Sequence, residues 1–488
     1  MVEDVPQYSS SKKSAFEWDW TNTTTLKWCG VSLSEVIATG KRLEGSVFDP
    51  DGKRARKLVE TGKYPYQHIT GDDGLASAYT YGRFKRIWVP KSEYPIYQPS
   101  TIMDQMPGPD GYISGKTDTD INSLRVHLKQ VLLTCSGTIG NVSLVSKTLD
   151  NQIFSHDLIR ITCHDPSDSG YIYTYLKSKI GNKILLTNQY GAVVSHIEAN
   201  HLDNIIIPNP GDNIKNVISN LINKSFQLRD EANELLESAT SLLYDELALV
   251  SFEKEMEDNR CPINVFEVKI SDAQKRFDAS HHMPIYKKIV QHLEKHSKNI
   301  VNIGDEIISK KIFLPDRFKR VYVDEGYGIV FFSGKDILQL DPSNKKYLSK
   351  KHYDQKLIDE LILRKNMIVI TRSGTIGNIA LVPNHWDGWS MSDDIIRLIS
   401  KEGIEGYLYI WLNSKYGKML LTSSSYGAVV SHIEVEHVSS VKVPLLKNIS
   451  IQSKINDMAI KANDKRYEAY LLEQQALKMM DEEVLGLE

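Results

Sequence analysis

The chain has 488 residues, of which 41% are hydrophobic, 25% charged and 9% aromatic, and its formal net charge is −3. This length suffices for about three domains with buried cores, and the composition is that of an ordinary soluble protein, which excludes disulfide-stapled miniproteins and disordered chains. No apolar run approaches the roughly 18 residues that would span a bilayer, which excludes a membrane-embedded chain.

The first residues, MVEDVPQYSSSKK, are polar and lack the apolar core of a secretory signal, so we expect a cytoplasmic protein. The four cysteines lie far apart and form no CxxC pair, which argues against a zinc site and a disulfide framework. They are Cys29, Cys135, Cys163 and Cys261.

The first half of the chain predicts, in order, a basic RFKR segment at Arg83–Arg86, a strand and turn containing SGTIGN, and one amphipathic helix, GYIYTYLKSKIGNKILL, from Gly170. A YGAVVSHIE segment and an apolar strand before Asn209 follow. Later β-rich runs bounded by turn residues, such as Gly328–Phe332 and Met367–Ile370, predict more short strands. The expected fold class is mixed α/β.

A long helix with a coiled-coil seam is predicted next, with Asp212 as its N-cap. Its apolar positions follow alternating steps of four and three, broken by Ser225, and the same seam recurs near the C-terminus after the cap Ser450, broken by Lys465. We expect the two helices to pack on each other; the alternative is that each packs on the core of its own half. The seam residues are Ile214, Ile218, Leu221, Leu228, Ala232, Leu235, Ala239 and Leu242 in the first helix, and Ile451, Ile455, Met458, Ala462, Ala469, Leu472, Ala476 and Met479 in the second.

The whole chain is an internal repeat with a shift near 237 residues. TCSGTIGNVSLV at Thr134–Val145 returns as TRSGTIGNIALV at Thr371–Val382, and YGAVVSHIE is identical at Tyr190–Glu198 and Tyr426–Glu434. A period this long indicates a duplicated domain and not a solenoid. The expected division is a globular domain over residues 1–210, a helix over 211–260, a second globular domain over 261–447 and a second helix over 448–488.

Charge is distributed unevenly along the chain. Phe226–Arg260 holds 3 basic and 10 acidic residues, and Asp457–Glu488 holds 4 basic and 8 acidic residues. The remaining residues therefore carry a modest positive excess, which could face a polyanion.

Motifs of cofactor-dependent and metal-dependent enzymes are missing or fit poorly. The SGKT that ends at Thr117 lacks the first glycine of a P-loop, and neither GxGxxG nor the Asn-Pro-Pro-aromatic signature of adenine methyltransferases occurs. Glu267 and Lys269 resemble a nuclease Glu-x-Lys pair without the upstream Pro-Asp. We expect no catalytic residue, no bound metal and no bound cofactor in this chain.

Twin His-x-Glu motifs, His196 with Glu198 and His432 with Glu434, could supply metal ligands or an acid–base pair, because alternate residues of a strand share a face. No third ligand recurs at comparable spacing apart from a second histidine five residues further on. We favour a structural role in which each histidine makes a fixed hydrogen bond.

The RFKR segments place three cations in four residues, Arg83, Lys85 and Arg86 in one half and Arg317, Lys319 and Arg320 in the other. Such clusters suit contacts to DNA phosphates, and an exposed basic turn is the alternative.

The order and duplication of these motifs resemble the specificity subunit of type I restriction-modification systems. RFDASHHMP at Arg276–Pro284 is similar to the opening motif of that family's target recognition domains, and KRLEGSVFD at Lys41–Asp49 resembles a diverged first copy. The resemblance covers nearly the whole chain. It implies two target recognition domains separated by two long antiparallel coiled-coil helices.

The resemblance also implies the function: each domain reads one half of a bipartite, asymmetric site in double-stranded DNA, and partner subunits methylate adenine or restrict the DNA. The partners would be two methyltransferase subunits and motor/nuclease restriction subunits, with AdoMet and ATP bound by the partners and not by this chain. Two other readings remain: a specificity-like subunit of a fused restriction enzyme, and a coiled-coil adaptor without a DNA role.

If the halves read different sequences, discrimination should come from the regions where the two copies diverge. These regions are Tyr94–Gln130 against Tyr327–Lys365, and Ser143–Phe154 against Ala380–Met391. Their candidate donors to base edges are Lys116, Arg125, His127 and Lys129 in the first half and Lys335, Lys350, Lys351 and His352 in the second.

Overall fold

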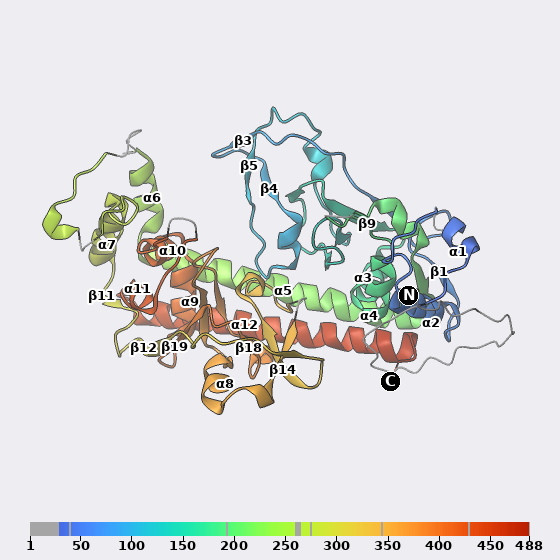
Figure 1. Ribbon diagram of the computed structural model, residues 1–488. Helices are drawn as coiled ribbons and strands as arrows, with labels where there is room; N and C mark the ends of the chain where they lie inside the picture. Colours follow the sequence, from blue (N-terminus) through green and yellow to red (C-terminus); the bar gives the residue numbers. More distant parts are fainter. Residues whose placement is uncertain are drawn as a thin grey trace, which may run out of the picture.

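The computed structural model describes residues 29–38, 41–191, 194–258, 265–273, 276–342, 345–427 and 430–487. Two long helices, α5 (Asp212–Glu246) and α12 (Ile449–Met479), run side by side through the middle of the molecule, and each carries a globular half (Figure 1). Both halves combine helices with sheets, so the expected mixed α/β class is confirmed.

The first half contains two four-stranded sheets and one two-stranded sheet. One sheet has the order β2 (Ala76–Tyr79), β9 (Leu158–Cys163), β6 (Val131–Thr134), β7 (Val142–Leu144). The other has the order β3 (Trp88–Val89), β5 (Gly111–Ile113), β4 (Pro95–Tyr97), β8 (Ile153–Phe154). The small sheet pairs β1 (Tyr66–His68) with β10 (Ile206–Pro208).

The second half repeats this order strand for strand. Its sheets are β12 (Ser309–Phe313), β19 (Ile395–Ser400), β16 (Ile368–Thr371), β17 (Ile379–Leu381); β13 (Tyr322–Val323), β15 (Lys346–Ser349), β14 (Gly328–Phe332), β18 (Ser390–Met391); and β11 (Asn299–Asn302) with β20 (Lys442–Leu445). Among the strands of the described residues, the pairs β4–β8 and β14–β18 alone are parallel. The strands predicted around Gly328 and Met367 are among them.

Short helices complete each half. The first has α1 (Leu33–Ala38), α2 (Pro50–Glu60), α3 (Ser169–Lys177) and α4 (Lys179–Leu186); the second has α7 (Pro284–His296), α8 (Gln355–Leu361), α9 (Glu405–Asn413), α10 (Lys415–Thr422) and α11 (Val435–Ser439). A further helix, α6 (Leu249–Asp258), follows α5, and α12 ends in a π-helical turn, Met480–Val484. Single 3-10 turns include η1 (Pro99–Met103), η2 (Asn122–Leu124), η3 (Pro166–Asp168), η4 (Ala199–Asn204), η5 (Ile270–Asp272), η6 (Gly334–Asp336), η7 (Lys350–His352) and η8 (Asn384–Trp386).

The two lead-in motifs, KRLEGSVFD and RFDASHHMP, have the same structural role. Arg42 donates to the carbonyls of Asn188 and Gln189, and Arg276 donates to the equivalent carbonyls in the second half. Each motif then enters a helix that has proline at its first position, Pro50 in α2 and Pro284 in α7. The arginine thus holds the start of each half against the loop after α4 or α10.

The amphipathic segment from Gly170 is two helices and not the single helix predicted. Ser178 has ψ 155° and caps α4 by accepting a hydrogen bond from the Gly181 N–H (3.1 Å), which ends α3 one residue earlier. A Cβ on Gly181 would lie 2.0 Å from the Tyr175 carbonyl oxygen, so the turn needs glycine. Ser414 breaks α9 from α10 in the same way.

The glycine that opens each of these segments brings a short helix against a long one. A Cβ on Gly170 would lie 2.6 Å from the Ser219 Cα of α5, and one on Gly406 would lie 2.3 Å from the Asn456 carbonyl oxygen of α12. Each long helix therefore packs closely on its own half.

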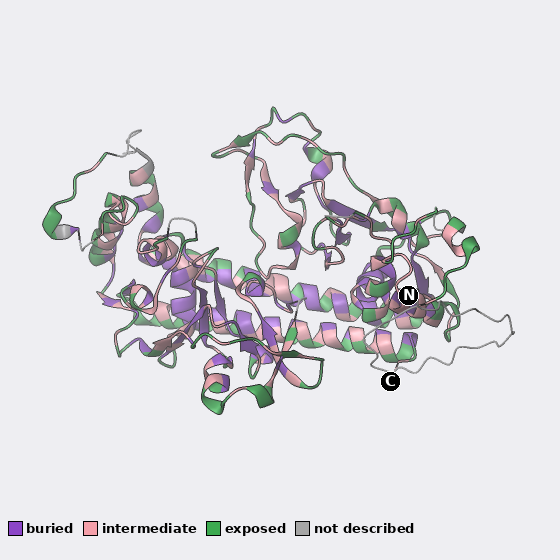
Figure 2. Cartoon of the chain, in the orientation of Figure 1, coloured by how far each residue is buried: buried purple, intermediate pink, exposed green. Residues whose placement is uncertain are grey.

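The long helices also pack on each other, and they run in opposite directions. Ser225 donates to the Ala469 carbonyl (2.7 Å), whereas Glu231, further along α5, pairs with the earlier Lys465 of α12 (2.5 Å). The two polar interruptions of the predicted seam are therefore each satisfied by the opposite helix. Figure 2 shows the buried residues concentrated where the sheets and short helices meet this helix pair.

The two predicted helix caps are wrong by one and two residues. Gly211 with φ 88° is the N-cap of α5, and Asp212 is instead its first residue, paired with Lys215 (3.4 Å). Asn448 caps α12 by accepting from the N–H groups of Ser450 and Ile451. Both regions offer several residues that can cap, and only the path of the incoming strand selects one.

Candidate nucleic-acid interface

The RFKR segments are anchored by their phenylalanines. Phe318 packs edge-on against Tyr353, with ring centroids 5.2 Å apart, and the Tyr353 hydroxyl donates to the Lys319 carbonyl (2.9 Å) and accepts from the Val321 N–H (2.6 Å). Arg317 and Lys319 remain exposed on either side of the anchored ring. The basic segment is therefore held on the surface in a fixed orientation.

The first half has the same arrangement with a different anchor. Phe84 packs edge-on against His156, with centroids 5.7 Å apart, and contacts the small core around Ile96 and Ile113. Arg83 and Lys85 are exposed, whereas Arg86 is half-buried, with its guanidinium 5.9 Å from the Phe84 ring centroid.

Each RFKR segment leads into an edge strand, β3 in the first half and β13 in the second. The neighbouring strand, β5 or β15, is followed by another basic residue, Lys116 or Lys350. The Ser114 N–H donates to the Ile87 carbonyl (2.8 Å), and the Ser349 N–H donates to the Val321 carbonyl (3.0 Å). Because β3 and β5, like β13 and β15, are antiparallel, the start of one strand lies beside the end of the other. We call this shared rim the basic edge. It consists of Arg83, Lys85, Arg86 and Lys116 in the first half and of Arg317, Lys319, Arg320, Lys350, Lys351 and His352 in the second.

Two aromatic residues on the basic edge were missed by the sequence analysis. Trp88 of β3 is 50% exposed and Tyr322 of β13 is 42% exposed, and they occupy equivalent positions of the two halves. The Lys346 ammonium lies 4.7 Å from the centre of the Tyr322 ring. Exposed aromatic rings beside cations can stack on bases, and an aromatic residue two places after each RFKR was a usable signal.

Four predicted base-reading residues lie away from the basic edge. Arg125 donates to the Asn151 carbonyl (2.7 Å) at the turn before β8, and His127 and Lys129 form the exposed turn before β6. Lys129 lines a groove beside the acidic residues Glu231 and Glu234 of α5. Lys335 belongs to η6 and is exposed.

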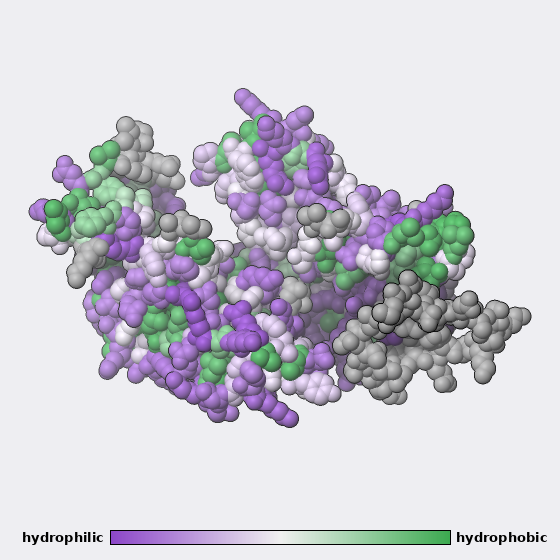
Figure 3. Space-filling view, in the orientation of Figure 1, coloured by the Kyte–Doolittle hydropathy of each residue, from purple (hydrophilic) through white to green (hydrophobic). Residues whose placement is uncertain are grey.

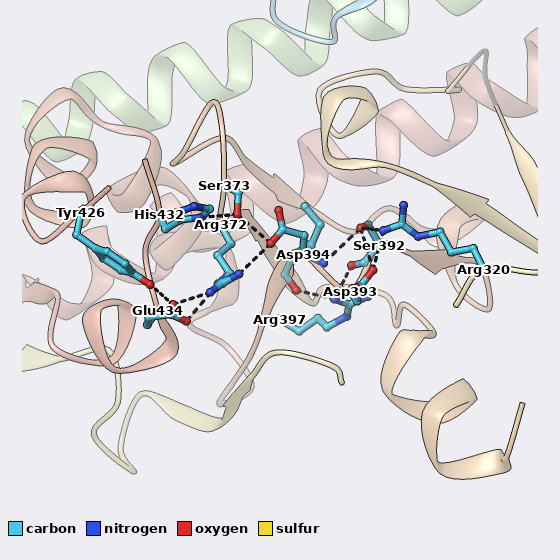
Figure 4. A network of polar contacts seen from close by, with 11 residues as sticks. Arg320, Arg372, Ser373, Ser392, Asp393, Asp394, Arg397, Tyr426, His432 and Glu434 are labelled. Atoms are coloured by element: carbon cyan, nitrogen blue, oxygen red, sulfur yellow. Dashed lines mark hydrogen bonds and ion pairs between the residues drawn. The ribbon is translucent and has the colours of Figure 1, made fainter. Parts of the chain in front are cut away.

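A continuous network of polar contacts links the basic edge of the second half to its YGAVVSHIE segment (Figure 4). Arg320 pairs with Asp393 (2.8 Å) and donates to Ser392 (3.2 Å), and the hydrogen bond that Asp393 accepts from Arg320 raises the pKa of Arg320. Of the RFKR cations in this half, Arg320 is therefore partly neutralised, and Arg317 and Lys319 are the more available for phosphates.

Arg372, the residue directly before the SGTIGN motif, forms the centre of this network. Its guanidinium pairs with Asp394 (3.1 Å) and with Glu434 (2.5 Å), and the Tyr426 hydroxyl also donates to Glu434. The hydrogen bond from Arg372 lowers the pKa of Glu434. The carboxylate of the His-x-Glu motif is thus committed to an intramolecular pair.

The histidine of the motif is also used structurally. Ser373 Oγ donates to Asp394 (2.9 Å), so the proton between Ser373 and His432 (2.8 Å) belongs to His432 Nδ1. In a hydrolytic triad the histidine lies between serine and carboxylate, and here the serine lies between the other two.

Both glutamates of the twin motifs act as helix caps. The Glu434 N–H donates to His437 Nδ1 (3.0 Å) at the start of α11, and the Glu198 N–H donates to His201 Nδ1 (3.2 Å) at the start of η4. This reciprocal capping explains the second histidine at the same spacing in both copies. Across the described residues, no group of three or more His, Cys, Asp or Glu side chains could hold a metal ion.

The first half lacks two of the charges of this network. Cys135 occupies the place of Arg372, and His156 occupies the place of Asp393. Burial lowers the pKa of His156, which keeps it neutral near pH 7. The same scaffold therefore presents different charges in its two copies.

The second half matches a known family over residues 299–458, by the model described as "Type I restriction modification DNA specificity domain". Residues 299–458 are therefore similar to type I restriction-modification DNA specificity domains. The resemblance to type I specificity subunits, first drawn from the repeated motifs, is confirmed over this region. The matched range contains every strand of the specificity domain, from β11 to β20, and the first part of α12.

Three solved structures were found to be similar to the chain. The S subunit of a type I system from M. genitalium is 14% identical, with a TM-score of 0.34, covering 87% of this chain and 96% of that one. The HsdS subunit from Thermoanaerobacter tengcongensis is 14% identical, with a TM-score of 0.26 and coverage of 86% and 99%. A chain from a structure on complex assembly and conformational transition of the type I R-M system has the same identity and TM-score, with coverage of 86% and 98%. No curated protein sequence matches the chain. In the described part of the chain, no helix is long and apolar enough to cross a membrane.

Proposed function

We propose that this chain is the DNA-reading subunit of a type I restriction-modification complex, in which each half reads one part of a bipartite, asymmetric site. The observation that carries the proposal is the specificity domain at residues 299–458 together with the identical strand order of the first half. The two halves share one fold but differ in their local charges, so each half can recognise a different half-site.

The basic edges support contact with double-stranded DNA. Each half presents cations held by anchored aromatic rings, with an exposed Trp88 or Tyr322 beside them. Cations on a fixed rim can position a half on the phosphates, while the divergent loops read base edges.

The helix pair supports the role of a spacer that also receives partners. Its first helix, α5, holds 7 acidic and 3 basic residues, which suits protein partners better than DNA. Exposed apolar side chains recur at equivalent positions within the two lead-in motifs, Leu43 (80% exposed) and Phe277 (87% exposed). Figure 3 shows hydrophobic side chains gathered over α1. Twin apolar sites fit two copies of one partner, here two methyltransferase subunits, with restriction subunits joining them.

A domain exchange tests the reading function. Replacing Arg276–Pro444 with the corresponding region of a related protein leaves α5 and α12 unchanged, so assembly with the methyltransferase should persist. Sequencing of methylated sites in cells should show one half of the motif altered and the other unchanged. A change in both halves at once would contradict one half-site per domain.

Catalysis is proposed to belong to the partners, with AdoMet on the methyltransferase and ATP on the restriction subunit. The purified chain should select a bipartite motif from randomised duplexes without transferring a methyl group or cutting DNA. Methyl transfer or cleavage by the pure chain would favour the fused-enzyme reading, and absence of any DNA binding would favour a coiled-coil adaptor.

A further inference from the structure

The two halves touch each other directly, as well as through the long helices. The Gln105 N–H donates to the Leu338 carbonyl (2.8 Å), and the Gln105 side-chain amide donates to the Gln339 carbonyl (3.1 Å). Asp104 and Gln339 face each other as an antiparallel bridge. We call these residues, 104–105 and 338–339, the latch.

The latch joins equivalent positions of the two copies. Tyr97 ends β4 beside Phe154 in parallel register, and Phe332 ends β14 beside Met391 in the same register. Asp104 lies seven residues after Tyr97, and Gln339 lies seven residues after Phe332. A contact between a residue and its own counterpart is the mark of a two-fold axis, as in an isologous dimer interface.

The same axis passes through the middle of the helix pair. Arg229 of α5 and Arg466 of α12 are counterparts in the repeat, and both line one cavity together with Asp104 and Gln105. Leu340, directly after the latch, packs against Leu228 and Ala469 of the two helices in a small apolar cluster. The latch is therefore seated on the centre of the spacer.

The groups under the latch are tightly paired. Glu473 is fully buried and accepts from Lys177, Arg229 and the Tyr173 hydroxyl, while Arg466 donates to Asn233 across the helices (3.1 Å). Side chains held this way leave the helix pair little freedom to slide or roll. Because the latch lies directly on these paired side chains, it holds the two halves in one relative orientation.

We propose that the latch, the direct contact between the two halves, restricts the chain to one number of base pairs between its two half-sites. This inference rests on the proposed function. Adding one base pair moves a half-site by about 3.4 Å along the duplex and turns it by about a tenth of a turn. Helices joined only to their own halves would let the halves follow such a change, whereas main-chain hydrogen bonds between the halves resist it.

A proline at position 105 tests the main-chain bond. Gln105→Pro removes the N–H donor, and the preceding Asp104 has φ −72° and ψ 146°, a conformation that a residue before proline tolerates. Gln105→Ala is the matched variant, because it keeps the N–H and loses only the side-chain bond. The full chain of each form would be used to select from a library of randomised duplexes, and the bound fraction sequenced.

The wild type and Gln105→Ala should each select two half-motifs at a single separation. Gln105→Pro should select the same half-motifs at two or more neighbouring separations. An unchanged single separation in Gln105→Pro would overturn the proposal.

A cross-link tests the latch without DNA. The Cα atoms of bridge partners lie about 4.5 to 5.5 Å apart, within the reach of a disulfide. Asp104→Cys with Gln339→Cys should therefore form an intramolecular disulfide on mild oxidation, and each single variant should not. The oxidised double variant should keep the single separation.

The two failures differ in outcome. If the chain selects a bipartite motif but the double cysteine variant does not cross-link, the latch is absent and the inference is wrong. If cross-linking is efficient but the wild type selects no bipartite motif, the proposed function has failed and the spacing role falls with it.

Discussion

At the scale of single residues, one buried arginine stabilises each half in the same way. Arg160 of β9 and Arg397 of β19 are fully buried and donate to main-chain carbonyls of the loops around them. Arg397 reaches carbonyls of Leu361, Met391 and Ser392. A buried cation without a carboxylate partner persists because several carbonyl dipoles replace its hydration.

Replacing this arginine should destabilise its half strongly. Arg397→Leu leaves several buried carbonyls without a donor, and hydrogen bonds to charged groups are each worth about 1.5 to 3 kcal/mol. We expect a loss of about 3 kcal/mol or more in the free energy of unfolding, measured by chemical denaturation. Arg364→Leu, at a side chain that is 62% exposed, is the control and should change stability little. Equal stability of the two variants would contradict the structural role.

Asp104 makes the latch sensitive to pH. Burial raises the pKa of Asp104 from its ordinary value of 3.8 to about 7. The protonated form is therefore favoured in the folded state, and its stabilising contribution is present below about pH 4 and is lost as the pH rises through about 7. The charged groups around the same cavity are Lys177, Arg229, Asp230, Asp341, Arg466 and Glu473.

Asp104→Asn should remove this dependence. A difference of one in pKa corresponds to about 1.4 kcal/mol, so at pH 8 the variant should be more stable than the wild type by at least about that amount. At pH 4 the two should be nearly equal. Thermal unfolding at both pH values checks the sign; a variant less stable at pH 8 would show that the ionised carboxylate is stabilised in the fold.

At the scale of secondary-structure elements, the helix seam is narrow because its central residues are small. Ala232, Ala239, Ala462, Ala469 and Ala476 are all fully buried between the helices or against the adjacent core. The burial stripe also includes neighbours outside the predicted seam, among them Ile222, Leu236 and Leu243, because each helix faces both the other helix and its own half. Both of the packing modes considered from the sequence are therefore present together.

Overpacking this seam should weaken the helix pair. Ala232→Phe or Ala469→Phe should cost about 1 to 3 kcal/mol, since neither site has free volume. Assembly with the methyltransferase should weaken in parallel, while DNA binding by each half is retained. Ser241→Phe, on the exposed side of α5, is the control. Unchanged unfolding and assembly for both alanine variants would mean that the helices do not depend on each other.

At the scale of the whole molecule, charge is separated between the basic edges and the acidic helix α5. Arg317→Gln with Lys319→Gln should weaken binding to all duplex sequences alike and lower the slope of log affinity against log salt by about 1.8, or about 0.9 for each phosphate contact. The control, Lys454→Gln with Lys461→Gln, removes the same charge from the exposed face of α12. Equal effects of the two pairs would show that only net charge matters.

The sequence by itself determined the repeat, the α/β class and the long helices. Identical strings at a constant shift, and apolar residues at steps of three and four, are properties of the chain that do not depend on its folded path. The sequence also located the RFKR segments and the lead-in arginines at equivalent positions of the two halves, because each motif occurs twice.

Only the tertiary structure decided where the helix from Gly170 breaks and which residues cap α5 and α12, since these depend on small local preferences that neighbouring elements override. It also separated Lys116 and Lys350, which lie on the basic edges, from Lys129, which faces an acidic helix although it stands close to Lys116 in sequence. The latch could not be predicted from the sequence for the same physical reason. Its two loops are distant along the chain, and they meet only because the sheets and the helix pair bring them to one axis.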